Sequence, residues 1–236
     1  MTRELFRKEP YLQSCEARVL RCDRRGLGLD RTIFYPESGG QPGDTGTVIL
    51  SDGASIRVVD TIRHPVTGQH IHVLEPGFEE LPPGTTVTAQ IDWDRRYRHM
   101  RMHSCLHLLC AVVPGGVSGC QISAEKGRMD FDLENVKLDK QQIEQDLNRL
   151  IQEDRKIGYR FITEEELAEK PDLVRTLRVR PPTCDGSVRV IEIESIDAQP
   201  CGGTHVASTA EIGPVRIGKI ENKGKHNRRI NVHFIE

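Results

Sequence analysis

The sequence predicts an α+β fold in two parts, a β-barrel-like domain over residues 1–90 and an α+β domain over residues 91–236. Short apolar runs between Gly, Pro and Asp residues fill the first part, without helical periodicity. A helical spacing of apolar residues begins near Ile91. After Val188, apolar and polar residues alternate again, as in strands. With 236 residues, the chain is long enough for two modest domains.

Six short strands are expected in the first part because each run is apolar or alternating and is bounded by turn residues. The runs lie at residues 17–21, 31–34, 46–50, 56–59, 71–74 and 86–91. Pro82, Pro83 and Gly84 mark a turn before the last run. Six short strands at this spacing predict a small barrel or a folded sheet.

The second part is expected to begin with a helix that Asp92 or Asp94 caps and that ends before Pro114. A second helix is predicted from Asp139, with Gln142 three residues later as in a capping box. The strands expected after these helices lie at 188–193, 212–220 and 229–234.

A third, short helix is predicted between the second helix and the strand at 188–193. Thr163 and Glu166 form a capping-box signature at its start, and Pro171 interrupts it. Strands and helices therefore follow one another in the second part, which is typical of an α+β domain.

The composition excludes a disordered chain and a membrane-embedded one, since 36% of the residues are hydrophobic and 29% are charged. No apolar run approaches the roughly 20 residues of a membrane span, and no signal-peptide core follows Met1. We therefore expect a cytoplasmic protein. Seven cysteines without a C-x-x-C pair suggest mostly buried thiols.

The formal net charge of −2 means that a nucleic-acid partner would have to be bound by a local basic surface. Two segments are rich in basic residues, and a solvated charged face is the alternative explanation of each. The first holds Arg95, Arg96, Arg98 and Arg101; the second holds Arg216, Lys219, Lys223, Lys225, Arg228 and Arg229.

Two imidazoles lie four residues apart in the segment His103-Ser104-Cys105-Leu106-His107. In a helix, this spacing places both rings on one face, one turn apart, as in many metal sites. The alternative is a pair of ordinary surface or core histidines.

A second pair of possible metal ligands lies in the segment Cys201-Gly202-Gly203-Thr204-His205. The two glycines permit the tight turn that brings a thiolate and an imidazole together. Taken alone, this segment could equally be an ordinary Gly-Gly turn.

Together the two pairs predict a zinc site formed by His103, His107, Cys201 and His205. Three imidazoles and one thiolate suit tetrahedral Zn²⁺ and differ from the oxygen-rich shells of Mg²⁺ and Ca²⁺. The pairs are far apart in the sequence, so the metal would join a helix to a distant loop. Cys201 either completes the shell or stands beside an open position.

The two ligand motifs resemble those of the editing domain of alanyl-tRNA synthetases and of its free-standing relatives, the alanyl-tRNA editing proteins of the AlaX family. Further segments that carry the resemblance occur in the same order as in the family. They are 34–46 (FYPESGGQPGDTG), 121–131 and 211–214 (EIGP), while the Cys-His motif itself lies within 199–206 (QPCGGTHV). The resemblance covers nearly the whole chain.

The resemblance implies a trans-editing deacylase that hydrolyses the ester of tRNA(Ala) carrying the wrong amino acid, serine first and glycine second. It implies Zn²⁺ as the cofactor and no nucleotide cofactor, no ATP and no membrane. The metal would either activate the attacking water or anchor the α-amino group of the substrate. We expect a monomer without an aminoacylation domain. The alternative is a non-catalytic, zinc-stabilised tRNA-binding module.

An enzyme that accepts serine and spares alanine needs a polar group placed for the serine hydroxyl. Gln41, Ser104 and Thr204 are the residues expected to contact the substrate, with Thr32 and Thr45 as further candidates. The residues between the two helical histidines depart from the His-Thr-Ala-Thr-His pattern frequent in the synthetases. The preference between serine and glycine therefore stays open.

Overall fold

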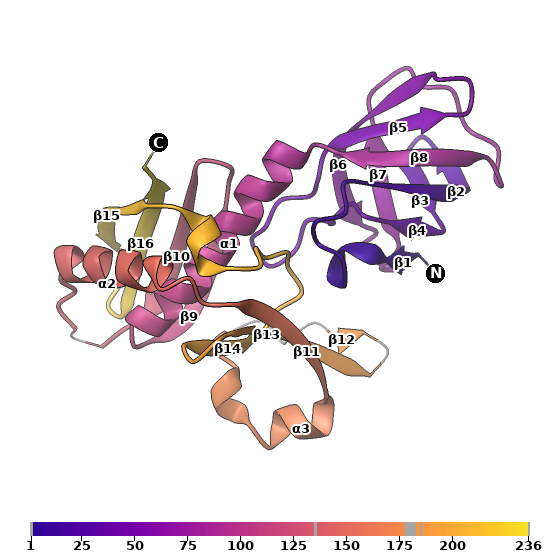
Figure 1. The fold of residues 1–236 in the computed structure, drawn as a ribbon. Helices are drawn as coiled ribbons and strands as arrows, with labels where there is room; N and C mark the ends of the chain where they lie inside the picture. The colour runs from indigo at the N-terminus through magenta and orange to yellow at the C-terminus, as the bar shows by residue number, and fades with distance from the viewer. Residues whose placement is uncertain (1, 135, 178–182, 185, 236) are drawn as a thin grey trace. The chain divides into compact units, whose positions relative to one another are not determined.

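The computed structural model describes residues 2–134, 136–177, 183–184 and 186–235 (Figure 1). They form two compact units, Met1–Tyr97 and Arg98–Glu236. The fold is α+β and contains a six-stranded barrel, which confirms these two parts of the predicted fold. The domain boundary at residue 90 stays a prediction.

Unit 1 is built around a closed barrel in the order β2-β3-β7-β6-β5-β8. Its strands are β2 (Ser14–Asp23), β3 (Gly26–Leu29), β5 (Gly46–Leu50), β6 (Ser55–Arg63), β7 (His70–Leu74) and β8 (Thr86–Ile91). Alternate side chains fill the interior, as on β8, where Val87, Ala89 and Ile91 are buried. Five of the six predicted runs lie on these strands.

The predicted strand at 31–34 is wrong. Only Arg31–Thr32 forms a strand there (β4), and it pairs with β1 (Arg3–Glu4) outside the barrel. The sixth strand of the barrel is instead β3, whose four residues are all buried. Gly26 has a φ of +127°, and a Cβ there would lie 2.3 Å from the carbonyl oxygen of His72. Only glycine permits this approach, and the glycines conceal the strand signal.

A buried ion pair joins the barrel to the start of α1 (Trp93–Val112). Arg96 and Asp44 are both almost completely buried, and Arg96 Nε donates to the two Asp44 oxygens at 3.0 and 2.9 Å. Asp44 also accepts from the backbone N–H of Tyr35, and Arg96 donates to the carbonyl of Ile33. Each charge is therefore paired and hydrogen-bonded. The suggestion that Arg96 contacts phosphate is wrong.

His72 lies in the barrel core with both ring nitrogens paired. Nδ1 is 2.9 Å from the carbonyl oxygen of Leu27, and Nε2 is 2.7 Å from the Thr32 hydroxyl. Because a carbonyl only accepts, Nδ1–H donates to Leu27, and Nε2 accepts from Thr32. Burial lowers the pKa of His72 to about 4, so the ring is neutral in the folded protein.

Unit 1 is therefore expected to lose stability as the pH falls from about 6.5, where a histidine of the unfolded chain gains its proton, to about 4. Because folded His72 takes up its proton only near pH 4, the free energy of unfolding should fall by about 3 kcal/mol over this range. Urea unfolding between pH 7 and 4 of the wild-type and His72→Gln proteins measures it. The glutamine variant, which cannot titrate, should be less pH-dependent; equal profiles would contradict the prediction.

Unit 2 contains two antiparallel sheets (Figure 1). The first has the order β15-β16-β10-β9, and in the second β13 pairs with β11, β12 and β14. The strands of the first sheet are β9 (Gly116–Ile122), β10 (Lys126–Asp132), β15 (Val215–Asn222) and β16 (Asn227–Phe234). Those of the second are β11 (Ile157–Thr163), β12 (Thr183–Cys184), β13 (Ser187–Ile193) and β14 (Asp197–Pro200).

The expected strands at 188–193 and 229–234 are confirmed by β13 and β16. The strand expected at 212–220 begins later, at Val215, because Thr209–Ile212 forms a 3₁₀ helix. Ser208 caps this short helix in a complete capping box with Glu211. Alternation of apolar residues alone could not separate the two elements.

Helix α1 packs closely on the first sheet where β10 carries a glycine. A Cβ at Gly127 would lie 2.7 Å from the sulfur of Met102 and 3.2 Å from Leu106. His103 and His107 each follow one of these residues and so lie about 100° further round the helix. The contact with the sheet thus turns both imidazoles away from it.

Helix α2 (Lys140–Gln152) covers the free edge of β15. The Asn148 side chain donates to the carbonyl of Val215 and accepts from its N–H, at 2.7 and 3.0 Å. The carboxylate of Glu144 accepts from the N–H of Ile217 at 2.7 Å. The edge is therefore protected from pairing with another chain.

The predicted helix caps are largely confirmed. Asp139 accepts from two backbone N–H groups in the first turn of α2, but the Gln142 side chain binds Asp146 instead of completing a capping box. Thr163 and Glu166 form a complete capping box at the start of α3 (Glu164–Ala168). Among the described residues, none of the helices is long and apolar enough to cross a membrane.

Candidate metal centre

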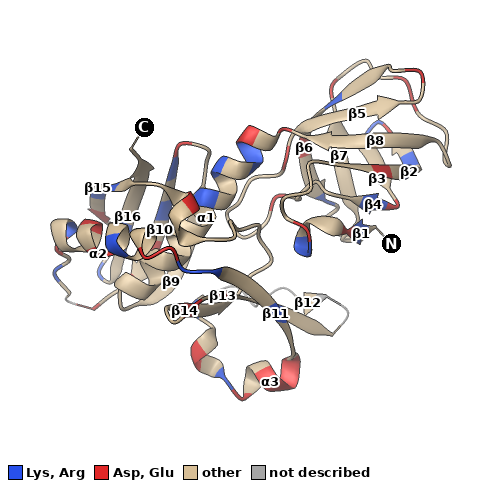
Figure 2. Ribbon diagram, viewed as in Figure 1, with Lys and Arg blue, Asp and Glu red and all other residues tan. Residues whose placement is uncertain are grey.

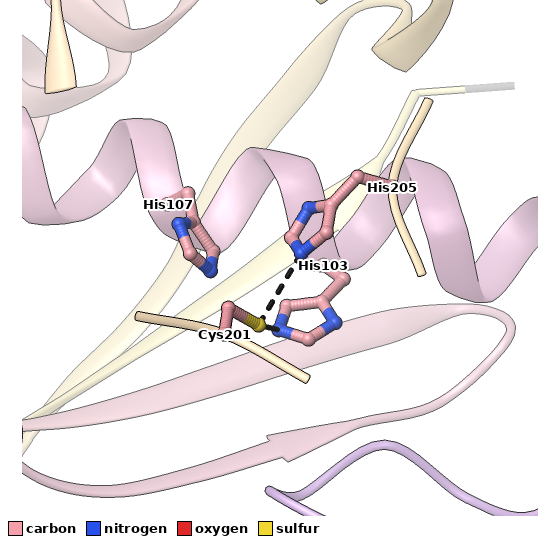
Figure 3. A group of neighbouring side chains, drawn as sticks. All are labelled: His103, His107, Cys201 and His205. Carbon is pink, nitrogen blue, oxygen red and sulfur yellow. Dashed lines mark hydrogen bonds between the residues drawn. The ribbon is translucent and has the colours of Figure 1, made fainter. Parts of the chain in front are cut away.

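Four side chains of unit 2 converge as the sequence predicts: His103, His107, Cys201 and His205 (Figure 3). One ligand atom from each lies within 4.8 Å of the others. The sulfur of Cys201 is 3.5 Å from Nε2 of His103 and 3.4 Å from Nε2 of His205. In a tetrahedral zinc site the sulfur–nitrogen separation is about 3.6 Å, from metal distances of about 2.3 and 2.05 Å. The donor set therefore fits Zn²⁺.

The four ligands come from two elements that are distant in the sequence. Helix α1 supplies His103 and His107, whose ring centres are 5.3 Å apart. The loop after β14 supplies Cys201 and His205, and the His205 ring centre lies 4.3 and 4.6 Å from the two helical rings. The helical spacing and the Gly-Gly turn thus act as the sequence analysis expects.

Burial keeps the three imidazoles neutral. It is the main reason that the pKa of His103 and that of His205 lie well below the usual value and that the pKa of His107 falls to about 4. The positive charge of Arg189 lowers all three pKa values further. A neutral imidazole has the lone pair that a metal requires. The three imidazoles are therefore in the protonation state that binds zinc.

The buried side chain of Arg189, on β13, holds the Cys-His loop, which runs from Cys201 to His205. It donates to the carbonyls of Cys201 and Gly203 at 3.2 and 2.7 Å, and its guanidinium lies 4.9 Å from the centre of the Tyr159 ring. The N–H of Cys201 donates back to the carbonyl of Arg189 at 2.9 Å. Arg189 is not among the residues predicted from the sequence. Its signal is an arginine within the apolar run at 188–191.

Replacing Arg189 by methionine is expected to weaken zinc binding about 10- to 100-fold, because two loop carbonyls lose their donor and the ligands are less well oriented. Competition with a chelator measures the affinity, and thermal melting reports on folding. Arg189→Lys should recover part of the affinity through one donor. The matched control is Arg160→Met on the adjacent strand. Wild-type zinc affinity in Arg189→Met would contradict the prediction.

Ser104 lies directly behind His205. Its Oγ is 3.2 Å from Nδ1 of His205 and accepts from the backbone N–H of Val206 at 3.2 Å. If Nε2 binds the metal, Nδ1 carries the proton and donates it to Ser104. Ser104 therefore orients a ligand, and its contact with substrate stays a prediction. Thr204 is also buried, within the ligand loop.

The other predicted substrate-contacting residues belong to unit 1. Gln41 is buried, and its backbone pairs with that of Ser38. The Thr32 hydroxyl donates to His72 and accepts from the N–H of Phe34, so its bonds are used inside the barrel. A role for Gln41 or Thr45 in the reaction stays a prediction.

Comparison with known proteins relates nearly the whole chain to one family. An alanyl-tRNA editing protein, AlaX-M, of Methanosarcina barkeri is 38% identical over the full length of both chains. The AlaX-M protein of Saccharolobus solfataricus is 35% identical over 98% of each chain. The chain belongs to the alanyl-tRNA editing proteins. An alanine–tRNA ligase of Pyrococcus abyssi is 35% identical over 93% of this chain and 24% of its own length.

Two family models divide the similarity between the units. The model for the second additional domain of threonyl- and alanyl-tRNA synthetases matches residues 188–231, which include Arg189, Cys201 and His205. The class II (A) tRNA synthetase model matches residues 8–95, which include the barrel. The α1 ligands of this alanyl-tRNA editing protein lie between the two matched regions.

The remaining cysteines were expected to be buried, and only some of them are. Cys105 and Cys110 are buried, and burial raises the pKa of each to about 12. Cys15, Cys22 and Cys120 are half-buried rather than buried, and burial raises their pKa values as well. These five thiols stay protonated at neutral pH. The side chain of Cys184 lies outside the described residues.

Proposed function

We propose that this alanyl-tRNA editing protein is a zinc-dependent deacylase that acts in trans, without ATP. It hydrolyses the ester bond of tRNA(Ala) mischarged with serine, and glycine is the second substrate. The observation that carries the proposal is the convergence of His103, His107, Cys201 and His205. Full-length similarity to proteins named as alanyl-tRNA editing proteins supports the substrate class.

The residues of the site would hold and orient the metal. When bound, Zn²⁺ supplies a Lewis acid for ester hydrolysis. His103 and His205 present Nε2 toward the sulfur of Cys201, which favours Cys201 as a fourth ligand. Ser104 fixes the tautomer of His205, and Arg189 fixes the loop.

Selection for serine requires a polar partner for its hydroxyl that alanine leaves unsatisfied. We assign this role to Gln41 and Thr204, with Ser104 as the third candidate. Thr204 adjoins the ligand His205 and is completely buried. A buried polar group that loses its partner costs about 1–3 kcal/mol, which favours serine over alanine.

Deacylation of Ser-tRNA(Ala), Gly-tRNA(Ala) and Ala-tRNA(Ala) tests the proposal, with zinc content measured on the same protein. We expect rapid loss of serine, slower loss of glycine and little loss of alanine. His103→Ala should abolish the reaction and lower the zinc content. His64→Ala, which removes a histidine of unit 1 outside the cluster, is the matched control.

A folded, zinc-loaded protein that binds tRNA without deacylating it would contradict the enzyme and support the non-catalytic binding module. Rapid loss of alanine would contradict the assigned selectivity. Hydrolysis with no dependence on zinc would contradict the role of the metal.

A further inference from the structure

A hollow of about 680 Å³ opens at one end of the first sheet of unit 2, apart from the four ligand residues. Its walls come from α1, from the turn between β9 and β10, and from β15 and β16. The lining residues are Arg98, Ala124, Glu125, Arg216, His233 and Phe234. Two arginines and a histidine thus face one space.

Three basic side chains form a row across the sheet beside this hollow. Lys126 on β10 is the cross-strand partner of His233 on β16, which is also the partner of Arg216 on β15. Cross-strand partners lie on the same face of a sheet. Burial lowers the pKa of His233, and the positive charges of Arg216 and Lys126 lower it further. Lys126 and Arg216 thus place one positive charge on either side of His233.

The ion pairs of this face lie away from Lys126 and Arg216. Further along the same face, Asp130 accepts from both Arg229 and Arg128, at 2.7–3.0 Å. Among the described residues, neither Lys126 nor Arg216 forms an ion pair. Glu125 is the one acid in the lining of the hollow. Figure 2 marks the basic residues of α1 and of the β9–β10 region in blue.

We propose that this cationic hollow binds a phosphate group of the tRNA backbone. The inference rests on the proposed function, which makes tRNA the substrate. Arg98 and the ligand His103 lie five residues apart on α1, or about 8 Å along the helix axis. Arginine and lysine bind phosphate irrespective of base sequence.

The test compares two double variants that each remove two positive charges from unit 2. Lys126→Ala/Arg216→Ala removes charges beside the hollow, and the control Lys140→Ala/Arg149→Ala removes charges from α2. The affinity for deacylated tRNA(Ala) is measured at increasing salt. The first variant should bind about tenfold or more weakly. The slope of log affinity against log salt concentration should fall by about one to two. The control should stay close to wild type.

Zinc content and thermal melting show whether each variant is folded, and Arg216→Lys should retain most of the affinity. Wild-type tRNA affinity and salt dependence in the hollow variant would overturn the inference. Loss of competition by inorganic phosphate with unchanged tRNA affinity would also overturn it, because the hollow would then bind only free phosphate. A wild-type protein that binds tRNA without hydrolysing Ser-tRNA(Ala) counts against the proposed function and leaves this binding test intact.

Discussion

Arg96→Met is expected to destabilise unit 1 by about 3–5 kcal/mol, because it leaves the carboxylate of Asp44 buried without its cation. The carboxylate keeps one backbone donor, the N–H of Tyr35, which cannot replace the guanidinium. The carbonyl of Ile33 also loses its donor. Urea or guanidinium unfolding, with fluorescence of the single tryptophan Trp93 as the probe, measures the change.

A double-mutant cycle separates the ion pair from packing. Asp44→Asn alone should also destabilise unit 1, because it leaves the guanidinium buried without its anion. The double variant Arg96→Met/Asp44→Asn should lose less stability than the sum of the two single changes, since no unpaired charge remains. Strictly additive losses would show that the two side chains do not stabilise each other. The control is Arg149→Met on α2, an exposed arginine whose loss should cost less than about 1 kcal/mol.

Cys201→Ala is expected to weaken zinc binding more than about 100-fold, beyond the effect of residues that only orient ligands. The sulfur lies at tetrahedral distance from two imidazole nitrogens, so its removal leaves three histidines and an open corner. Deacylation of Ser-tRNA(Ala) should fall with zinc occupancy. Chelator competition and a deacylation assay on the same preparation measure both quantities.

The variant Cys22→Ala is the control, because it removes a half-buried thiol of unit 1. It should keep the zinc affinity and deacylation rate of the wild type. Unchanged zinc affinity in Cys201→Ala would show that Cys201 stands beside an open position and is not a permanent ligand. A measurement at saturating zinc then tells whether three histidines suffice for hydrolysis.

Local patterns in the sequence identified most of the barrel and the four residues that could hold a metal. Period-two alternation gave β5 and β8 at their observed bounds, and hydroxyl or carboxylate caps marked the starts of α2 and α3. The ligand pairs were visible because each lies within five residues. Such signals depend on backbone geometry over one turn or one strand, which the local sequence determines.

Other elements were invisible to local patterns. Strand β3 has the sequence Gly-Leu-Gly-Leu, which contains no polar residue, and Gly127 weakens the alternation of apolar and polar residues in β10. Gly26 of β3 and Gly127 are explained by a close approach from another element, by His72 in the first case and by Met102 in the second. A glycine in the sequence does not show which neighbouring group occupies the space that a side chain would fill.

The sequence by itself determined five of the six barrel strands, the caps at the starts of α2 and α3, and the four residues that could hold a metal. Only the tertiary structure decided what the basic residues do: Arg96 pairs with Asp44, Arg189 holds the ligand loop, and Arg216 joins the row beside the hollow. The physical reason is that an arginine is normally exposed and is buried only where the fold supplies partners for its charge, which a local pattern does not show. Its role depends on which carboxylates, carbonyls and aromatic rings the folded chain brings within reach.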